Sequence, residues 1–264
     1  MTKIVAILNI TPDSFSDGGV NFAIDNAINT AQSMIDAGVD VIDIGGQSTR
    51  PGSGMLTYED EWHRLRPVIG AISSMVKNTK VEVSVDSYHY QTIEKAMLLG
   101  IDIVNDVSGS IDDKITEMVA EHGQIKMVLM HNLGIPADLK NVIMEVNHLE
   151  VIEQWGLEKI IYLKERGISD NQIIFDPGIG FGKNAEQAID IIKKIDYFKH
   201  LGQIMVGHSR KSFIKLFSDV EASQRDIETH IASAYLAQKN IAYLRVHDFI
   251  GNSRAINIAK YLWE

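Results

Sequence analysis

The sequence predicts an α/β protein folded as a (β/α)8 TIM barrel, in which a parallel eight-stranded barrel is surrounded by helices. Short apolar runs alternate with longer segments of helical periodicity along the whole chain, which is typical of a parallel sheet with helical connections. The length of 264 residues is usual for such a barrel as one domain. Because no linker-like or low-complexity stretch divides the chain, we expect a single domain over residues 1–264.

Each predicted strand is a short apolar run rich in Val and Ile, as expected for strands that are buried on both faces. The eight runs are Ile4–Ile10, Val39–Gly45, Val81–Asp86, Ile101–Val107, Lys126–His131, Ile173–Asp176, Ile204–Gly207 and Ile241–Val246. Eight such runs separated by helices favour a closed parallel barrel over an open doubly wound sheet.

The segments between the runs predict amphipathic helices. These helices are Ala23–Ala37, Tyr58–Lys77, Tyr90–Leu99, Asp112–His122, Ile143–Glu165, Glu186–Leu201, Arg225–Gln238 and Ser253–Leu262. Several of them precede a glycine that is suited to a helix C-cap, namely Gly38, Gly100, Gly123, Gly167 and Gly202.

Composition excludes several classes of protein. The chain is 45% hydrophobic, too apolar for disorder, and without Cys it forms no disulfides and has no thiolate ligand or Cys nucleophile. No signal peptide fits before Ile4, and no apolar run approaches the ~18 residues of a membrane span, so we expect a cytoplasmic protein with no membrane partner. The net charge of −10, without a dense basic stripe, argues against nucleic acid as a partner.

Every predicted strand ends in polar residues, and the carboxyl ends of barrel strands meet at the active-site face. These residues are Asn9, Asp43, Asp86, Asn105 with Asp106, His131, Asp176, Ser209-Arg210-Lys211 and Arg245-Val246-His247-Asp248. Any one of them alone is readily explained as a helix N-cap or turn former. Eight strands that all end in this way instead predict one polar mouth.

Two sets of strand-end residues suit two parts of a ligand. Asp86, Asn105 and Asp176 supply acceptors, and Asn105 also supplies donors, which suits a planar heterocycle with several N–H groups, such as an aminopyrimidine. Lys211, Arg245 and His247 supply positive charge that suits a phosphate or diphosphate. Turn hydrogen bonds and surface salt bridges are the respective alternatives.

Loops near the strand ends add further candidates. The Ser209-Arg210-Lys211-Ser212 stretch predicts a helix start whose backbone N–H groups hold an anion such as a carboxylate. Two segments rich in Gly, Ser and Asp, residues 11–19 and 45–54, are placed to close over a substrate. The alternative interpretation is that both are surface loops without a functional role. Asn9 and Asp17 are oxygen ligands compatible with Mg²⁺ held mainly by a substrate diphosphate.

Together, the motifs resemble the dihydropteroate synthase family over essentially the whole chain. The matching stretches are Asn9–Gly19, Asp43–Gly52, Ser84–Ser87, Asn105–Val107, Met130-His131, Asp176–Lys183, Ser209–Phe213 and Arg245–Asp248. The two long loop motifs are highly specific, and the short motifs gain weight from their order and spacing.

The resemblance implies a pterin-binding TIM barrel that joins 4-aminobenzoate to 6-hydroxymethyl-7,8-dihydropterin diphosphate in folate biosynthesis, a homodimer, and a sulfonamide target. It assigns Asp86, Asn105, Asp176 and Lys211 to the pterin, and Asn9, Arg245 and His247 to the diphosphate and its Mg²⁺, with Asn9 as metal ligand. It assigns the aminobenzoate side to a third set, namely Phe15, Thr49, Arg50, Pro51, Phe181 and Ser212. Asp86, Lys211, Arg245 and His247 are the expected catalytic residues.

Two departures from the family pattern accompany the resemblance. Gln47 stands where the family usually has Glu, and Ala188 stands where it usually has Asn, which predicts one lost charged contact and one lost polar contact near the pocket. Two other functions stay open: a pterin-binding methyltransferase that acts on methyltetrahydrofolate, and a non-catalytic pterin-binding homologue.

Overall fold

The strands form a closed barrel, with every neighbouring pair parallel and the order following the sequence. The structure, a computed structural model, describes residues 2–10, 19–47, 54–110, 112–135, 138 and 140–263. The strands are β1 Lys3–Asn9, β2 Val41–Gly45, β3 Glu82–Asp86, β4 Ile103–Asp106, β5 Lys126–Met130, β6 Ile173–Asp176, β7 Gln203–Val206 and β8 Tyr243–Val246. The predicted parallel eight-stranded barrel is therefore confirmed.

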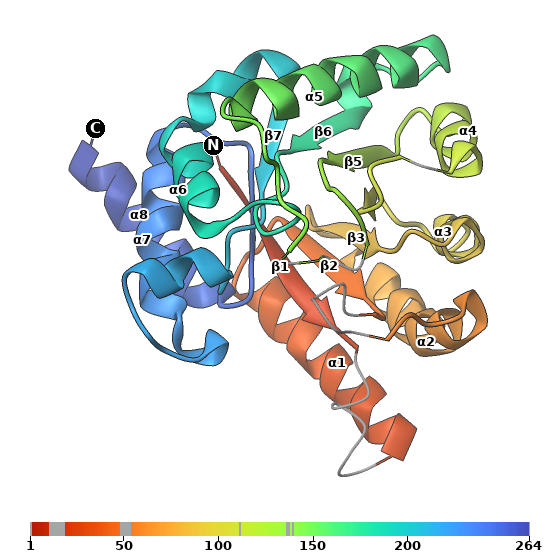
Figure 1. The fold of residues 1–264 in the computed structure, drawn as a ribbon. Helices are drawn as coiled ribbons and strands as arrows, with labels where there is room; N and C mark the ends of the chain where they lie inside the picture. Colours follow the sequence, from red (N-terminus) through yellow and green to blue (C-terminus); the bar gives the residue numbers. More distant parts are fainter. Residues whose placement is uncertain are drawn as a thin grey trace.

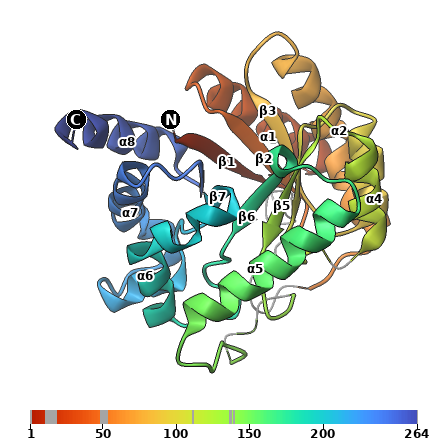
Figure 2. The same ribbon diagram turned by 90° about the horizontal axis from the view of Figure 1, so that it is seen from above.

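Helices surround the strands (Figure 1, Figure 2). The α-helices are α1 Gly19–Asp36, α2 Tyr58–Val76, α3 Tyr90–Met97, α4 Asp113–Glu121, α5 His148–Glu165, α6 Ala185–Lys193, α7 Asp226–Gln238 and α8 Phe249–Trp263. Short 3-10 helices lie between them, namely η2 Asp170–Gln172, η3 Ile195–Leu201, η4 Ser212–Leu216 and η5 Ala222–Gln224. In the part of the chain that the structure describes, no helix has the length and apolar character to cross a membrane.

Some predicted helix boundaries and one predicted cap were wrong. The helix predicted from Ile143 begins at His148, because Ile143 instead donates its N–H to the carbonyl of Gly182 and is buried. The predicted helix after Glu186 is α6 followed by the 3-10 helix η3. Of the five predicted cap glycines, Gly123 lacks the left-handed conformation that the other four adopt.

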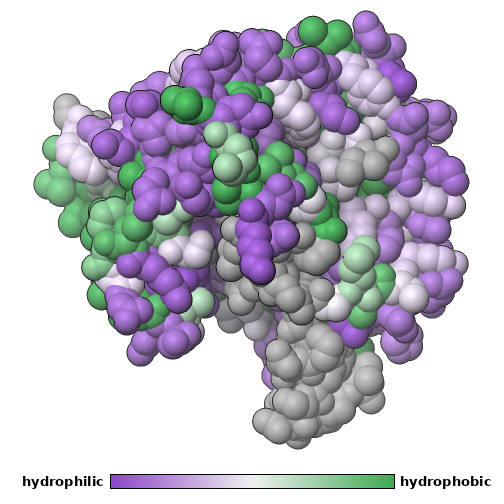
Figure 3. Space-filling model, in the orientation of Figure 1, coloured by the Kyte–Doolittle hydropathy of each residue, from purple (hydrophilic) through white to green (hydrophobic). Residues whose placement is uncertain are grey.

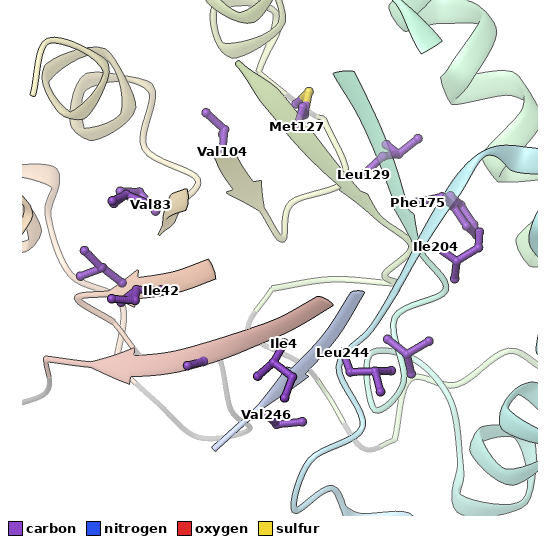
Figure 4. Packing of buried hydrophobic residues seen from close by; sticks show 14 of the residues in the cluster. Ile4, Ile42, Val83, Val104, Met127, Leu129, Phe175, Ile204, Leu244 and Val246 are labelled. Atoms are coloured by element: carbon purple, nitrogen blue, oxygen red, sulfur yellow. The ribbon is translucent and has the colours of Figure 1, made fainter. Parts of the chain in front are cut away.

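The main hydrophobic core lies between the barrel and its helices. Alternate strand residues such as Ile42, Val83 and Phe175 point outward, as Figure 4 shows. A second buried cluster, made of Val5, Val41, Ile103, Val128, Ile174, Met205 and Tyr243, groups residues from alternating positions of the same strands. Because successive side chains of a strand point to opposite faces, this second cluster fills the barrel interior as packed layers.

An ion-paired layer lies beyond this inner cluster, at the amino ends of β1, β3 and β5. Glu82 accepts hydrogen bonds from Lys3 at 2.7 Å and from Lys126 at 2.5 Å. Burial by itself would raise the pKa of Glu82, but its bonds to Lys126 and Lys3 outweigh burial and lower that pKa. The ion pairs therefore stabilise the fold above the unfolded-state pKa of Glu82, and this contribution is lost as the pH falls through its folded-state pKa.

Replacing Glu82 with Gln is expected to lower the free energy of unfolding by about 1–3 kcal/mol, since two half-buried ammonium groups lose their partner. Catalytic activity should be retained, because Glu82 begins its strand and the candidate site lies at the other end. Urea unfolding at pH 7 measures the change, with the exposed Glu121→Gln as the matched control. Equal stability of the two variants at pH 7 would contradict the assignment.

Candidate active site

A cavity of about 400 Å³ opens at the carboxyl ends of the strands. Each of the eight strands contributes to its lining, either directly or through residues that follow it. Nine predicted site residues line it, namely Asn9, Asp86, Asn105, Asp176, Phe181, Lys211, Ser212, Arg245 and His247. The other predicted residues, Phe15, Asp17, Thr49, Arg50 and Pro51, lie outside the described residues. Of the predicted strand-end residues, Asp43, Asp106, His131 and Asp248 do not line the cavity, and Phe181 and Ser212 were predicted from the family resemblance and not from the strand ends.

A buried network around Asp43 forms the cavity floor. Arg245 donates to Asp43 and to Asp86, both at 2.6 Å. Asp43 also accepts hydrogen bonds from Ser84 Oγ at 2.5 Å and Asn105 Nδ2 at 3.1 Å. Asp43 is fully buried and does not line the cavity, so it positions Arg245 and Asn105 for whatever binds above them.

The sequence did not reveal this role, although Asp43 was among the strand-end residues. In the structure, Asp43, Asn105, Asp176 and Arg245 each stand two residues after a member of the inner apolar cluster on their own strands, but the sequence alone does not say which alternate residues of a strand face inward. With a side-chain period of two, these residues form the next inward layer.

The carboxyl groups of the cavity ionise less readily than ordinary aspartates. Burial raises the pKa of Asp86 to about 7, although Arg245 opposes the rise. Burial also raises the pKa of Asp176, against the influence of the Gly178 N–H, Lys211 and Lys183. Hydrogen bonds from N–H groups of a ligand would stabilise the charged form of such carboxylates, because these bonds replace the bonds to water that are lost on burial.

The turn after β6 fixes the position of Asp176. Asp176 Oδ1 accepts the N–H of Gly178 at 2.7 Å, and Gly178, Gly180 and Gly182 have φ of 70°, 82° and 71°. A side chain at Gly178 would overlap the carbonyl oxygen of His131. Three left-handed glycines therefore let the chain double back tightly over the end of β5.

A buried lysine closes this turn, and the sequence did not predict its role. Lys183 Nζ lies 2.7 Å from His131 Nδ1 and 2.9 Å from the His131 carbonyl oxygen. Burial and then the nearby Lys183 lower the pKa of His131 to about 3, so its neutral Nδ1 can accept a hydrogen bond from the Lys183 side chain. The pair joins the end of β5 to the segment that carries Phe181.

Substituting Gly178 by Ala is expected to lower the free energy of unfolding by about 3 kcal/mol or more, since the new methyl group combines a steric overlap with an unfavourable φ. Substrate affinity should fall with it, because Asp176 loses its backbone partner. Thermal denaturation together with ligand titration reports both effects. Gly123→Ala is the control, because no atom lies within 4 Å of the added methyl group there. Similar behaviour of the two variants would refute the argument.

The segment after β7 brings Lys211 to the cavity. Lys211 Nζ lies 4.4 Å from the centre of the Phe181 ring. Arg210, which has φ of 58°, forms two hydrogen bonds with Asp226, at 2.7 and 2.8 Å. The predicted helix start is the 3-10 helix η4 of five residues.

His247 is oriented by a serine from the neighbouring strand end. Its backbone N–H donates to Ser209 Oγ at 3.2 Å, and its Nδ1 lies 3.0 Å from the same oxygen. This contact holds the imidazole at the cavity, where His247 is part of the lining.

Other residues at or just after the strand ends form turn hydrogen bonds. This is the alternative interpretation that the sequence left open for strand-end polar residues. Asp106 accepts the N–H groups of Ser108 at 2.8 Å and Ser110 at 3.2 Å. Ser87 donates to Glu61 at 2.7 Å and accepts the N–H of His89 at 3.1 Å. Neither residue lines the cavity, because each directly follows an inward-facing strand residue.

The two departures from the family pattern differ in their surroundings. Gln47 lines the cavity, donates to Tyr88 at 2.6 Å and accepts the N–H of Leu56 at 3.0 Å. Ala188 is buried in the hydrophobic core on α6 and is not part of the cavity lining. The expectation of a lost polar contact near the pocket at Ala188 therefore finds no support in the described cavity.

Asn9 is the described residue predicted to bind a metal. It ends β1 and lines the cavity. Within the described ranges, no group of three or more His, Cys, Asp or Glu residues is arranged to hold a metal ion. A cation at Asn9 would therefore need most of its ligands from substrate and water, which is usual for Mg²⁺ bound with phosphates.

Comparison with known proteins identifies the family of this chain. The sequence profile of the family described as "Pterin binding enzyme" matches residues 5–247. Dihydropteroate synthase of Clostridium beijerinckii is 39% identical over 258 residues, which cover 96% of this chain and 91% of the relative. A probable bifunctional folylpolyglutamate synthase/dihydropteroate synthase of Haloferax volcanii is 38% identical over 98% of this chain, which spans only 30% of that longer relative.

A solved structure gives the same result in three dimensions. Dihydropteroate synthase from Anaplasma phagocytophilum, crystallised with 6-hydroxymethylpterin-monophosphate, superposes with a TM-score of 0.90 at 37% identity and covers 99% of both chains. Because the similarity in sequence and in fold extends over nearly the whole chain, this chain belongs to the pterin binding enzyme family and, within it, to the dihydropteroate synthases.

Proposed function

We propose that this enzyme condenses 6-hydroxymethyl-7,8-dihydropterin diphosphate with 4-aminobenzoate, giving 7,8-dihydropteroate and diphosphate in folate biosynthesis. The observation that carries the proposal is the cavity floor, where Asp86, Asn105 and Asp176 converge beside Arg245. Membership of the dihydropteroate synthases supports the same reaction.

The floor suits the donor-rich edge of a pterin. Asn105 Nδ2 donates to Asp43, which would leave its amide oxygen as an acceptor for the ligand. Asp176 and Asp86 supply carboxylate oxygens on neighbouring sides. The ring N–H and amino groups of the pterin would donate to these acceptors, while Lys211, above Phe181, would donate to ring acceptors.

The reaction needs positioning and charge stabilisation more than a protein nucleophile. The amine lone pair forms the new C–N bond at the methylene carbon, and the C–O bond breaks with its electron pair leaving on the diphosphate. The amine then loses a proton to water. Arg245 and His247 would stabilise the departing anion, and Phe181 and Ser212 would orient the aminobenzoate.

Mg²⁺ is the cofactor that we propose, with Asn9 as its ligand from the described protein residues. When bound, the ion would neutralise diphosphate charge. An amide oxygen at the cavity edge fits a hard cation that is held mainly by phosphate oxygens.

A second copy of the chain is the proposed protein partner. Exposed apolar side chains gather on two neighbouring helices, including Ile227 and Ile231 of α7 and Ile258 and Leu262 of α8. Hydrophobic residues are visible over this region in Figure 3, at the left edge. A patch of this kind marks interaction surfaces, and light scattering that gives the mass of a monomer would refute the dimer.

A diphosphate-release assay tests the proposed reaction. The purified enzyme, Mg²⁺ and the pterin diphosphate are assayed with and without 4-aminobenzoate. We expect release that requires the amine. Binding of the pterin diphosphate without release would favour a non-catalytic homologue, and methyl transfer from methyltetrahydrofolate without release would favour the methyltransferase.

A further inference from the structure

A buried lysine lies behind the cavity wall and has no part in the chemistry proposed above. The turn from Gly178 to Phe181 lines the cavity, whereas Lys183, two residues further on, does not. Lys183 is only 5% exposed, and none of the ion pairs among the described residues includes it. Burial of an amine is unfavourable unless hydrogen bonds replace those to water, so the position of Lys183 depends on its hydrogen-bond partners.

Both hydrogen bonds that Lys183 forms within the described residues go to His131. Nζ lies 2.7 Å from the imidazole Nδ1 and 2.9 Å from the carbonyl oxygen. His131 is itself buried, and its backbone N–H donates to the carbonyl of Asp176 at 2.9 Å. Its ring packs edge-on against Trp155, with 4.9 Å between the ring centres. His131 is thus fixed on two sides and forms a firm anchor for Lys183.

The turn between Asp176 and Lys183 needs such an anchor. Its three left-handed glycines allow many backbone conformations, and ordering a segment of this kind is entropically unfavourable. Within the turn, Gly178 donates its N–H to Asp176 Oδ1 at 2.7 Å and accepts the N–H of Phe181 at 3.0 Å. The Lys183–His131 contact ties the far end of the turn to β5, so it fixes how Asp176 and Phe181 face the cavity.

Lys183 also acts on Asp176 through its charge. Burial raises the pKa of Asp176, and Lys183 is one of the positive groups that oppose this rise. Asp176 in turn opposes the lowering of the Lys183 pKa by burial. The amine therefore favours the ionised carboxylate, which is the form that accepts hydrogen bonds from a donor-rich ligand edge.

We propose that Lys183 is a positioning residue for the pterin, because its bonds to His131 hold the glycine turn so that Asp176 meets the ring. The inference rests on the proposed function and deepens it. Displacing a binding group by about 1 Å can weaken its action about 100-fold. Arg245 and His247 belong to β8 and the segment after it and do not depend on this turn, so loss of Lys183 should weaken the pterin and spare the diphosphate.

Separate titration of the two parts of the substrate tests this division. Lys183→Met removes the amine and keeps an unbranched side chain of nearly the same length. Calorimetry well below the unfolding temperature gives dissociation constants for 6-hydroxymethylpterin and for inorganic diphosphate. We expect the pterin to bind about tenfold or more weakly and the diphosphate to change by less than about twofold. The KM for the pterin diphosphate should rise more than kcat falls.

Lys159→Met is the matched control, because the Lys159 amine also donates to a backbone carbonyl, that of Ser110 at 3.2 Å, but away from the cavity lining. Both affinities should stay within about twofold of wild type in this variant. If Lys183→Met does not fold, Lys183→Gln takes its place, since it keeps an N–H donor on a chain one atom shorter. It should weaken the pterin by about threefold or more and leave the diphosphate unchanged.

A double-mutant cycle tests whether the two residues act as one unit. His131→Phe keeps an aromatic ring against Trp155 and removes Nδ1. We expect the double variant His131→Phe/Lys183→Met to bind 6-hydroxymethylpterin within about twofold of Lys183→Met alone. Fully additive losses, equal losses of pterin and diphosphate, or wild-type pterin affinity in the Lys183 variants would overturn the inference. A wild-type enzyme that binds no pterin would instead contradict the proposed function.

Discussion

Replacing Asp176 with Asn is expected to weaken binding of the pterin diphosphate by about 30- to 5000-fold, which corresponds to about 2–5 kcal/mol for a buried charged acceptor. Asp176 is buried, and one of its oxygens already accepts the Gly178 N–H at 2.7 Å. Its remaining acceptor capacity faces the cavity. An amide at this position offers fewer acceptor sites and adds donors that would oppose those of the pterin.

Isothermal titration of the variant with the pterin diphosphate measures this loss. Asp106→Asn is the matched control, because Asp106 is an equally buried strand-end aspartate that caps a local turn. We expect Asp106→Asn to reduce stability but to leave pterin affinity within about fivefold, the size of an ordinary peripheral change. Unchanged affinity in Asp176→Asn would make that residue a turn former only.

Arg245→Lys should lower kcat/KM by about 30- to 1000-fold, corresponding to about 2–4 kcal/mol, although it keeps the positive charge. The guanidinium spans Asp43 and Asp86, with 2.6 Å to each. An ammonium group is a point charge without a planar fork, so it cannot hold both carboxylates in the same geometry. One buried carboxylate would then lack its partner.

The structure also changes what this variant is expected to do to product binding. The resemblance assigned Arg245 to the diphosphate and Lys211 to the pterin. Because Arg245 also holds Asp86, a predicted pterin residue, Arg245→Lys should weaken dihydropteroate, which has no diphosphate. Lys211→Ala should weaken dihydropteroate more, since its own contact with the pterin is removed. Affinities of both variants for dihydropteroate and for diphosphate test the assignment, and wild-type dihydropteroate affinity in Arg245→Lys would contradict it.

The fold was predictable because its pattern is local. Val- and Ile-rich runs alternate with helical segments, and that alternation requires no knowledge of distant contacts. The strand ends were predictable for the same reason, because every parallel strand delivers its last residues to one face. Asn105 and Asp106 show the limit of this reasoning. Successive side chains of a strand point to opposite faces, so one of the two points inward and the other outward. Which of them points inward depends on the register of the barrel.

The residues whose roles were missed depend on contacts between distant parts of the chain. Lys183 meets His131 across 52 positions, and Arg245 meets Asp43 across 202. The start of α5 was missed because Ile143 forms a nonlocal bond to Gly182, which overrides the helical pattern around it.

The fate of the oxygen between the pterin methylene carbon and the diphosphate tests the central claim most directly. The pterin diphosphate is labelled with ¹⁸O at that bridging position, the enzyme turns it over with 4-aminobenzoate, and mass spectrometry follows the products. The account predicts one unlabelled dihydropteroate for each diphosphate, with the label in the diphosphate. Labelled 6-hydroxymethyl-dihydropterin without dihydropteroate would show P–O cleavage by water, and it would contradict a condensation at this site.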